Sequence, residues 1–284
     1  MHYCYCQLQE DLKRLSEQYS GFQVRSIGNS CLGSPLYMFK LGEGRKQIFF
    51  SGAMHANESV TTKMLMLFAE RVLGWPSDAD RKIPFFRKAT LWIVPMVNPD
   101  GVELVCHGLE AIAPEWRETV LEINEQDTCF DTWKANIRGI DLNDQFPAFW
   151  EEEVARRGAV RPGPANYPGY EPLSEPESVA LAEFTLEQEF DRAIAWHSQG
   201  EEIYWGYREF EPPESKRLAK KMARASGYTA IRNVDSDAGY KDWFLMRFGK
   251  PAFTIECGLG VNPLPAEDAP DIMEKCWGIL SMGH

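Results

Sequence analysis

Three short segments of this chain are apolar on both of their faces, which is the pattern of strands in the middle of a covered sheet. They span residues 89–95, 192–196 and 252–255. Such strands need helices packed above and below them. Segments with apolar residues at helical spacing alternate with these strands along the chain, and this alternation predicts the α/β fold class.

Shorter segments complete the expected architecture. Further strands are predicted over residues 23–27, 36–40 and 47–51, which are separated by Gly, Asn and Ser turns. Helical spacing predicts helices over residues 5–19, 57–73, 175–189, 214–226 and 266–280. The Pro- and Gly-rich segment 161–172 is expected to be a surface loop near the site, because no second core pattern begins after it. We therefore predict one α/β/α domain over residues 1–284.

The composition and the charge limit the classes of partner. The chain has 284 residues, of which 44% are hydrophobic, and a formal net charge of −12. An acidic surface without a run of Lys and Arg does not favour nucleic acid or an anionic membrane as a partner. No apolar stretch reaches the ~18 residues that a membrane span needs. The sequence makes no prediction of the oligomeric state.

The N-terminus and the cysteines favour a reducing compartment. Residues 1–6 show no basic region followed by an apolar region, so no signal peptide is visible. The seven cysteines are an odd number and form no Cys-x-x-Cys pair, which is typical of reduced thiols. We expect a cytoplasmic protein, and the loss of a signal or of a further domain from a longer chain is the alternative.

Two histidines and a glutamate, placed in turns after predicted strands, form a candidate metal site. His55 follows the strand 47–51, Glu58 begins the next helix, and His197 ends the strand 192–196. Ligands gather outside the carboxyl ends of strands in open α/β sheets, so these side chains are expected to meet. Two histidines and one glutamate are a catalytic ligand set for Zn²⁺, with the fourth position open for water. The sequence therefore predicts one zinc ion in a hydrolase of amide bonds.

Parts of this site have alternative interpretations. A His-x-x-Glu pair such as His55 and Glu58 also occurs where a helix-start glutamate lies beside a turn histidine. His107, next to Cys106, is another possible ligand, but no acid follows it at ligand spacing, so a surface or packing role is expected. Glu256 follows the strand 252–255, where its carboxylate can serve as a general base or enter a structural ion pair.

Six short motifs occur in a fixed order along the chain. They are Ser51-Gly52-Ala53-Met54-His55-Ala56-Asn57-Glu58, Val94-Pro95-Met96-Val97-Asn98-Pro99-Asp100-Gly101, Arg138-Gly139-Ile140-Asp141-Leu142-Asn143, Leu173-Ser174-Glu175-Pro176-Glu177, His197-Ser198-Gln199-Gly200 and Phe253-Thr254-Ile255-Glu256. From about residue 20 to about residue 280 the chain resembles the zinc metallocarboxypeptidases, the carboxypeptidase A-like or M14 family. The resemblance implies a single α/β/α domain around a twisted, mixed eight-stranded sheet, with zinc held by His55, Glu58 and His197.

The resemblance also implies roles for residues beside the metal. Glu256 corresponds to the general base that takes a proton from water and returns it to the leaving amine. Arg138 matches an arginine that stabilises the oxyanion, and a surface ion pair is the alternative. Asn143 matches the asparagine that holds a substrate carboxylate. Ser198 and Gln199 are expected to orient a zinc ligand or the substrate.

The chain departs from ordinary family members near the substrate. Asp144 stands where they carry an arginine that binds a terminal carboxylate, and an anion there favours an ammonium group instead. Lys241 is expected at the floor of the pocket for the residue after the cleaved bond, where it favours an acidic group. The family tyrosine that covers the site has no clean match, because Val234 aligns with it and Tyr240 is only nearby. Tyr240 is therefore a candidate substrate-binding residue.

A leaving residue with an additional amine and an additional carboxylate suits this pair of charges. Meso-diaminopimelate is such a residue, and segments 144–147 and 197–205 resemble the bacterial branch that cleaves γ-D-glutamyl–diaminopimelate bonds of peptidoglycan stem peptides. Glu201, Glu202 and Trp205 are expected either to line this pocket or to form a solvated turn and a packed aromatic. We predict this activity. The alternatives are an ordinary metallocarboxypeptidase, a small-amide deacylase and a metal-free binding module.

Overall fold

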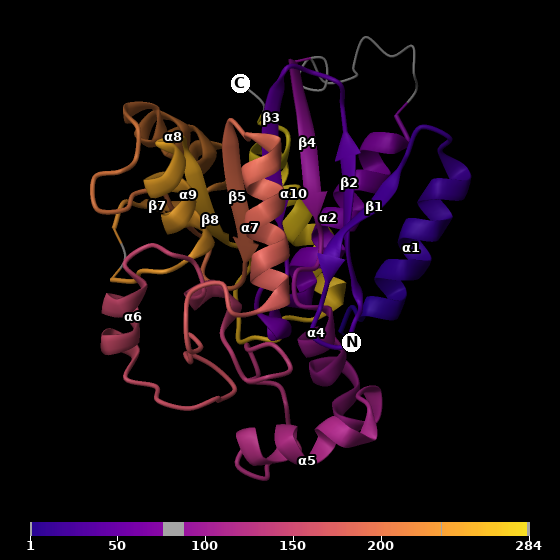
Figure 1. Cartoon of the computed structure of the whole chain (residues 1–284). Helices are drawn as coiled ribbons and strands as arrows, with labels where there is room; N and C mark the ends of the chain where they lie inside the picture. Colours follow the sequence, from indigo (N-terminus) through magenta and orange to yellow (C-terminus); the bar gives the residue numbers. More distant parts are fainter. Residues whose placement is uncertain (1, 76–87, 234, 283–284) are drawn as a thin grey trace.

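The computed structural model describes residues 2–75, 88–233 and 235–282. One eight-stranded sheet runs through it in the order β1-β2-β4-β3-β5-β8-β6-β7, with helices packed against both faces (Figure 1). The predicted α/β fold with a mixed eight-stranded sheet is therefore confirmed. The strands are β1 (Val24–Asn29), β2 (Pro35–Leu41), β3 (Lys46–Ser51), β4 (Ala89–Val94), β5 (Arg192–His197), β6 (Glu202–Tyr204), β7 (Thr229–Ile231) and β8 (Ala252–Glu256).

The parallel centre of the sheet brings several strand ends to one edge. β3 pairs in parallel with β4 and with β5, and β5 pairs in parallel with β8. The outer strands β2 and β6 run antiparallel to their inner neighbours. In this register His197 lies opposite Glu256, and each is the last residue of its strand. The carboxyl ends of β3, β5 and β8 are therefore neighbours.

Helices bury the two faces of the sheet in two separate cores. Along β3, Ile48 and Phe50 belong to one core and Phe49 belongs to the other, and all three are buried. This alternation explains why the central strands are apolar on both faces. The first core contains α1 (Tyr5–Gln18), α2 (Ser59–Leu73), α8 (Pro213–Ser226) and α10 (Ala269–Leu280), and the second contains α7 (Pro176–Gln188) and α9 (Tyr240–Phe248).

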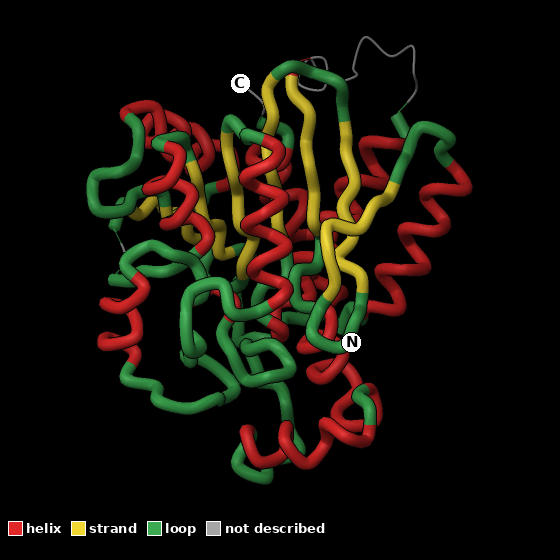
Figure 2. The backbone as a smooth tube through the Cα atoms, viewed as in Figure 1, coloured by secondary structure: helices red, strands yellow, loops and turns green. Residues whose placement is uncertain are grey.

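The long segment between β4 and α7 lies beyond the end of the sheet where β4 finishes, and it is drawn mostly as loop (Figure 2). It carries α4 (Pro99–His107), α5 (Pro114–Ile123) and α6 (Trp150–Arg157). Asn98 caps α4 by accepting a hydrogen bond from Gly101 N–H at 3.1 Å, and its amide donates to the Ala135 carbonyl at 2.9 Å. Residues 161–172 contain no helix or strand, as expected.

Some elements escaped prediction for physical reasons. β6 and β7 have three residues each, which is too short to show a period of two. The first six residues of α9, from Tyr240 to Leu245, are all buried, so this helix has no polar stripe to mark its periodicity. Among the described residues, no helix combines the length and the apolar character that crossing a bilayer requires.

A buried carboxylate lies in the first turn of α7. Glu177 is fully buried, and its Oε1 accepts a hydrogen bond from Cys31 N–H at 3.0 Å. Burial raises the pKa of Glu177 from 4.5 to about 7. Between these two values the folded chain keeps a proton that the unfolded chain has lost, so the free energy of unfolding contributed by this group falls as pH rises.

We expect Glu177→Gln to remove this part of the pH dependence. A neutral amide keeps an acceptor for Cys31 N–H but carries no buried charge. The free energy of unfolding of the variant minus that of the parent should therefore be larger at pH 8 than at pH 5, by on the order of 1–3 kcal/mol. Denaturant unfolding at both pH values measures it. Glu183→Gln, at an exposed position of the same helix, serves as the control and should show no such trend. An equal effect of both changes would contradict the assignment.

Candidate metal centre and active-site cleft

Three side chains from two distant parts of the chain converge at the carboxyl edge of the sheet. His55 follows β3, Glu58 ends the short 3₁₀ turn Ala56–Glu58, and His197 ends β5. The two carboxylate oxygens of Glu58 lie 2.9 Å from Nδ1 of His55 and 2.9 Å from Nδ1 of His197. The two Nδ1 atoms are 3.2 Å apart. The structure thus brings together all three residues that the sequence assigned to one ion, and their ligand atoms could hold a metal ion.

The spacing of these atoms fits a zinc ion. Around a tetrahedral zinc with bonds of about 2.0–2.1 Å, neighbouring ligand atoms are about 3.3 Å apart. The observed separations of 2.9 to 3.2 Å are close to this value. The side chains of Glu58 and His197 are each 2% exposed, whereas that of His55 is 13% exposed. The set is therefore held by the protein interior and reached from one side.

Asp141 orients one of the histidines from behind. Its Oδ1 lies 3.2 Å from Nε2 of His55, so the opposite ring nitrogen, Nδ1, faces Glu58 and His197. Asp141 is itself fixed, because it accepts hydrogen bonds from Asn143 N–H and Asn166 N–H at 3.1 Å each. A carboxylate on the far nitrogen of a ligating histidine sets the tautomer and raises the basicity of the ligand. Sequence reasoning gave Asp141 no role, although it stands inside the Asp-x-Asn motif.

The electrostatics of the group also favour a cation. Burial raises the pKa of Glu58, but the His55 and His197 rings outweigh it and lower this pKa to about 2. Burial lowers the pKa of His55, but Glu58 and Asp141 outweigh it and raise this pKa to about 10. The buried carboxylates of Glu58 and Asp141 are therefore stabilised by positive charge between them. A divalent ion supplies this charge while the histidines stay neutral.

A cleft of about 410 Å³ opens over this group. Glu256, at the end of β8, reaches it, and the backbone beside it is fixed because Cys257 N–H donates to the His197 carbonyl at 2.8 Å. Burial raises the pKa of Glu256 to about 7, and Glu58 adds to the shift while His197 opposes it. The cleft is lined by His55, Asn57, Glu58, Thr132, Lys134, Ser198, Gln199, Glu202, Tyr204, Glu256, Val261 and Asn262.

Among the described residues that line the cleft, Lys134 is a cation, and the structure places Arg138 elsewhere. Lys134 lines the cleft, lowers the pKa of Glu256 through its charge, and has its carbonyl bound by Ala56 N–H at 3.0 Å. Arg138 does not line the cleft, and its guanidinium lies 3.6 Å from Glu175 on a side chain that is 44% exposed. The alternative stated for Arg138, a surface ion pair, fits this geometry, and the oxyanion assignment does not.

Of the remaining predicted residues, Ser198 lines the cleft and Asn143 does not. The Ser198 hydroxyl donates to the Asn262 side chain at 2.9 Å. Asn143 is half-buried and accepts a hydrogen bond from Tyr240 N–H at 3.4 Å, but it is not a lining residue. Glu202 lines the cleft, which agrees with its expected place in the pocket. Glu201 instead pairs with Lys275.

The charge of Asp144 is buried and paired instead of facing a substrate. Its two carboxylate oxygens lie 2.7 and 2.8 Å from Nε and Nη2 of Arg157, and its side chain is 1% exposed. Arg157 Nε also lies 2.9 Å from Glu153. Burial, helped by Asp141, raises the pKa of Asp144 to about 7. The expected ammonium site at Asp144 is therefore wrong as stated, because the carboxylate already has a cation of this chain.

Lys241 and Tyr240 also lie inside the protein. The Lys241 ammonium donates to the Gly206 carbonyl at 2.9 Å and pairs with Asp242, and the residue is 4% exposed. Tyr240 is fully buried, and its hydroxyl lies 2.9 Å from that of Thr185. Neither lines the cleft, so their assignment to the substrate pocket is corrected. The alternative position, Val234, lies outside the described residues.

Residues 8–274 match the profile of the zinc carboxypeptidases of the M14 peptidase family. The chain therefore belongs to this family of zinc-dependent peptidases. The predicted enzyme class is therefore confirmed.

Two curated relatives match nearly the whole chain. It is 40% identical to γ-D-glutamyl-L-diamino acid endopeptidase 1 of Lysinibacillus sphaericus, over 99% of this chain and 72% of that protein. It is 39% identical to the protein YqgT of Bacillus subtilis, over 96% of this chain and 74% of that one.

Solved structures show the same fold at low identity. Thrombin-activatable fibrinolysis inhibitor aligns with a TM-score of 0.80 at 19% identity, over 99% of this chain and 73% of that chain. The murein-tripeptide amidase MpaA of Escherichia coli O157 aligns with a TM-score of 0.59 at 20% identity, over 91% and 92% of the two chains.

We expect Asp141→Asn to weaken zinc binding without unfolding the protein. An amide keeps one of the two accepting oxygens, which can still serve Asn143 N–H, but it loses the bond from Asn166 N–H and removes the charge behind His55. Zinc affinity should therefore fall about 10- to 100-fold. Competition with a chromogenic chelator measures the affinity, and the melting temperature of the chelated protein monitors the fold. Asp131→Asn, at an exposed position just before Thr132, is the control. Unchanged affinity in Asp141→Asn would remove Asp141 from the site.

Proposed function

We propose that this chain is a zinc peptidase that hydrolyses the γ-D-glutamyl–meso-diaminopimelate bond of peptidoglycan stem peptides. The observation that carries the chemistry is that His55, Glu58 and His197 meet at a cleft that Glu256 also lines, with His197 opposite Glu256 in the sheet. The proposal for the substrate is supported by 40% identity to a γ-D-glutamyl-L-diamino acid endopeptidase over 99% of this chain.

His55, Glu58 and His197 would hold the zinc ion. When bound, zinc polarises the scissile carbonyl and makes water nucleophilic near neutral pH. Glu256 then accepts a proton from the attacking water at its carboxylate and returns that proton to the leaving amine. A pKa near 7 suits both transfers, because the group can lose and regain a proton at neutral pH.

Lys134 takes the oxyanion role in this proposal. An oxyanion needs a donor in the cleft, and the Lys134 ammonium is available there while the Arg138 guanidinium pairs with Glu175. The backbone link between Lys134 and Ala56 keeps this lysine beside the loop that carries the first two ligands. Charge aimed at the developing oxyanion contributes more in a cleft with restricted water than in bulk solvent.

We expect Lys134→Ala to lower kcat about 10²- to 10³-fold, the usual cost of losing one oxyanion donor. Arg138→Ala is the matched comparison and should lower kcat by much less, because its partner Glu175 lies outside the cleft. Steady-state kinetics on the stem tripeptide with zinc-loaded protein measure both. A larger loss for Arg138→Ala than for Lys134→Ala would return the oxyanion role to Arg138.

The diamino acid specificity has a different basis from the one expected. Asp144 occupies the place of the family arginine but is neutralised by Arg157, so it does not select an ammonium directly. Glu202 lines the cleft, opposite Glu256 in the β6–β8 register, and Tyr204 donates its hydroxyl to it. We assign the second ammonium of diaminopimelate to Glu202 within this proposal.

The decisive experiment compares three substrates on one zinc-loaded preparation. We expect turnover of L-Ala-γ-D-Glu-meso-diaminopimelate, much slower turnover of the matched tripeptide that ends in L-2-aminopimelate and so lacks the second ammonium, and little turnover of hippuryl-phenylalanine. Glu256→Gln should keep zinc and lose about 10²- to 10⁴-fold in kcat. Preference for hippuryl-phenylalanine would favour an ordinary metallocarboxypeptidase, and turnover of simple acylated amines alone would favour a deacylase. Equal rates on the two tripeptides would contradict the diaminopimelate specificity.

A further inference from the structure

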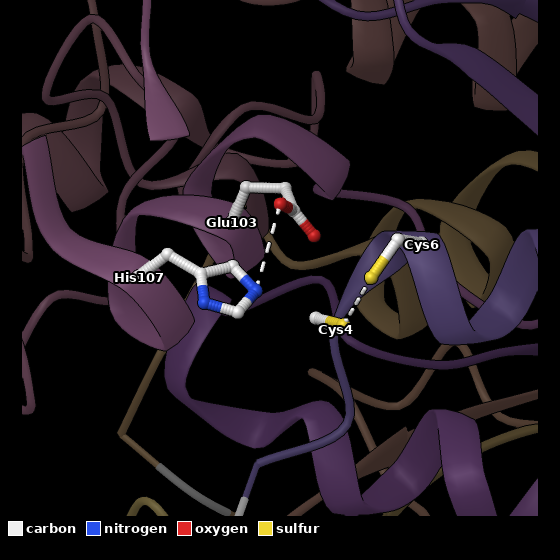
Figure 3. Close-up of side chains that lie close together, drawn as sticks. All are labelled: Cys4, Cys6, Glu103 and His107. Atoms are coloured by element: carbon white, nitrogen blue, oxygen red, sulfur yellow. Dashed lines mark hydrogen bonds and ion pairs between the residues drawn. The ribbon is translucent and has the colours of Figure 1, made fainter. Parts of the chain in front are cut away.

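A second cluster of metal-binding side chains lies where the N-terminus packs on α4 (Figure 3). Cys4 and Cys6 come from the start of α1, and Glu103 and His107 come from the last two turns of α4. One ligand atom from each of the four residues lies within 4.8 Å of the others. Figure 3 shows the two sulfur atoms and the His107 ring around a common space beside the Glu103 carboxylate.

The backbone holds this arrangement in place. Tyr5 N–H donates to Oε1 of Glu103 at 2.6 Å, which ties α1 to α4. The second oxygen of Glu103, Oε2, is left to face Nε2 of His107 at 3.9 Å. Cys4 N–H donates to the Gln7 side chain at 2.9 Å, so the backbone between the two cysteines is also fixed. Because Glu103 and His107 are four residues apart on one helix, their side chains point to the same side.

We propose that Cys4, Cys6, Glu103 and His107 form a second, structural zinc site. Two thiolates, one imidazole and one carboxylate are four N, S and O donors of the types that zinc binds, and four protein ligands close a structural site. Soft thiolate ligands select zinc over magnesium or calcium. The catalytic group contains no sulfur, so the two sites differ in chemistry.

The ion would need only a local adjustment of side chains. The two sulfur atoms lie 2.7 Å apart, and two thiolates on a tetrahedral zinc, each at about 2.3 Å, are about 3.8 Å apart. Cys6 and His107 are both exposed, so each can turn about its side-chain bonds without displacing a neighbour from the core. Cys4 is buried and supplies the fixed end of the site.

The consequence of this site is a metal link between the first helix and the helix that supports the catalytic loop. α4 packs against the 3₁₀ turn that ends in Glu58, and α1 also contacts α4. A metal bound to the folded chain and not to the unfolded one stabilises the fold. The proposed site acts on the structure, so the catalytic residues keep their roles whether or not it is filled.

Cobalt separates the two sites, because only the second contains thiolates. The full chain is stripped of metal under reducing conditions and titrated with Co²⁺. We expect two bound ions per chain and a near-ultraviolet thiolate-to-cobalt charge-transfer band. Cys4→Ser combined with Cys6→Ser should bind one ion, lose the band, and keep turnover of the stem tripeptide. One ion per chain and no band in the parent would overturn the proposal.

Two further variants test whether the band comes from this pair of cysteines and whether the other two ligands contribute to binding. Cys31→Ser is the matched control, because Cys31 lies in the separate group with Glu175 and Glu177, and it should keep the band. Glu103→Gln combined with His107→Ala leaves both thiols in place. This variant should bind Co²⁺ at the second site at least tenfold more weakly, as measured by titrating the charge-transfer band. A band that disappears in Cys31→Ser, or a Cys4–Cys6 disulfide in the reduced preparation by intact mass, contradicts the assignment. Loss of activity in Glu256→Gln with the band intact shows that the two sites are independent.

Discussion

The carboxylate of Glu58 is the contact on which the active site depends. Each of its oxygens approaches an imidazole, and the two imidazoles come from strands that are far apart in the chain and adjacent in the sheet. That adjacency exists because β3 and β5 pair in parallel and finish at the same edge. The apolar residues on both faces of these strands bury the sheet between two helical layers, and this burial positions the polar residues at its end. The packing of the central strands therefore determines which polar side chains meet at the carboxyl edge of the sheet.

The sequence predicted the sheet and the metal ligands because both leave strong local signals. A strand that is apolar on both faces has few alternatives to the middle of a covered sheet, and the residues after such strands share one edge. His197 and Glu256 end strands of this kind, and His55 and Glu58 follow β3, a neighbouring strand that ends at the same edge. The short strands β6 and β7 and the buried helix α9 gave no comparable signal. Three residues cannot show a period, and a helix buried along most of its length has no polar face.

The charged residues around the cleft were harder to predict, because their roles depend on partners that the sequence does not reveal. Lys134 and Arg138 are four residues apart in one loop, yet one lines the cleft and the other pairs with Glu175. Asp144 and Lys241 suggested two open charges, but each is compensated by a residue that contributes no motif, Arg157 and Asp242. A side chain supplies charge to a substrate only when the fold leaves that charge unmatched, and this is decided by three-dimensional contacts.

The Asp144–Arg157–Glu153 triad links the short turn that follows Asp141 to α6. Replacing Asp144 with the arginine of ordinary family members would set two guanidinium groups against each other in a buried place, and removing one member of such a group typically costs about 3–5 kcal/mol. Positions 144 and 157 should therefore change together in evolution. A chain of this family that gains the carboxypeptidase arginine at position 144 would therefore require a correlated pair of substitutions, with either single change acting as an unstable intermediate.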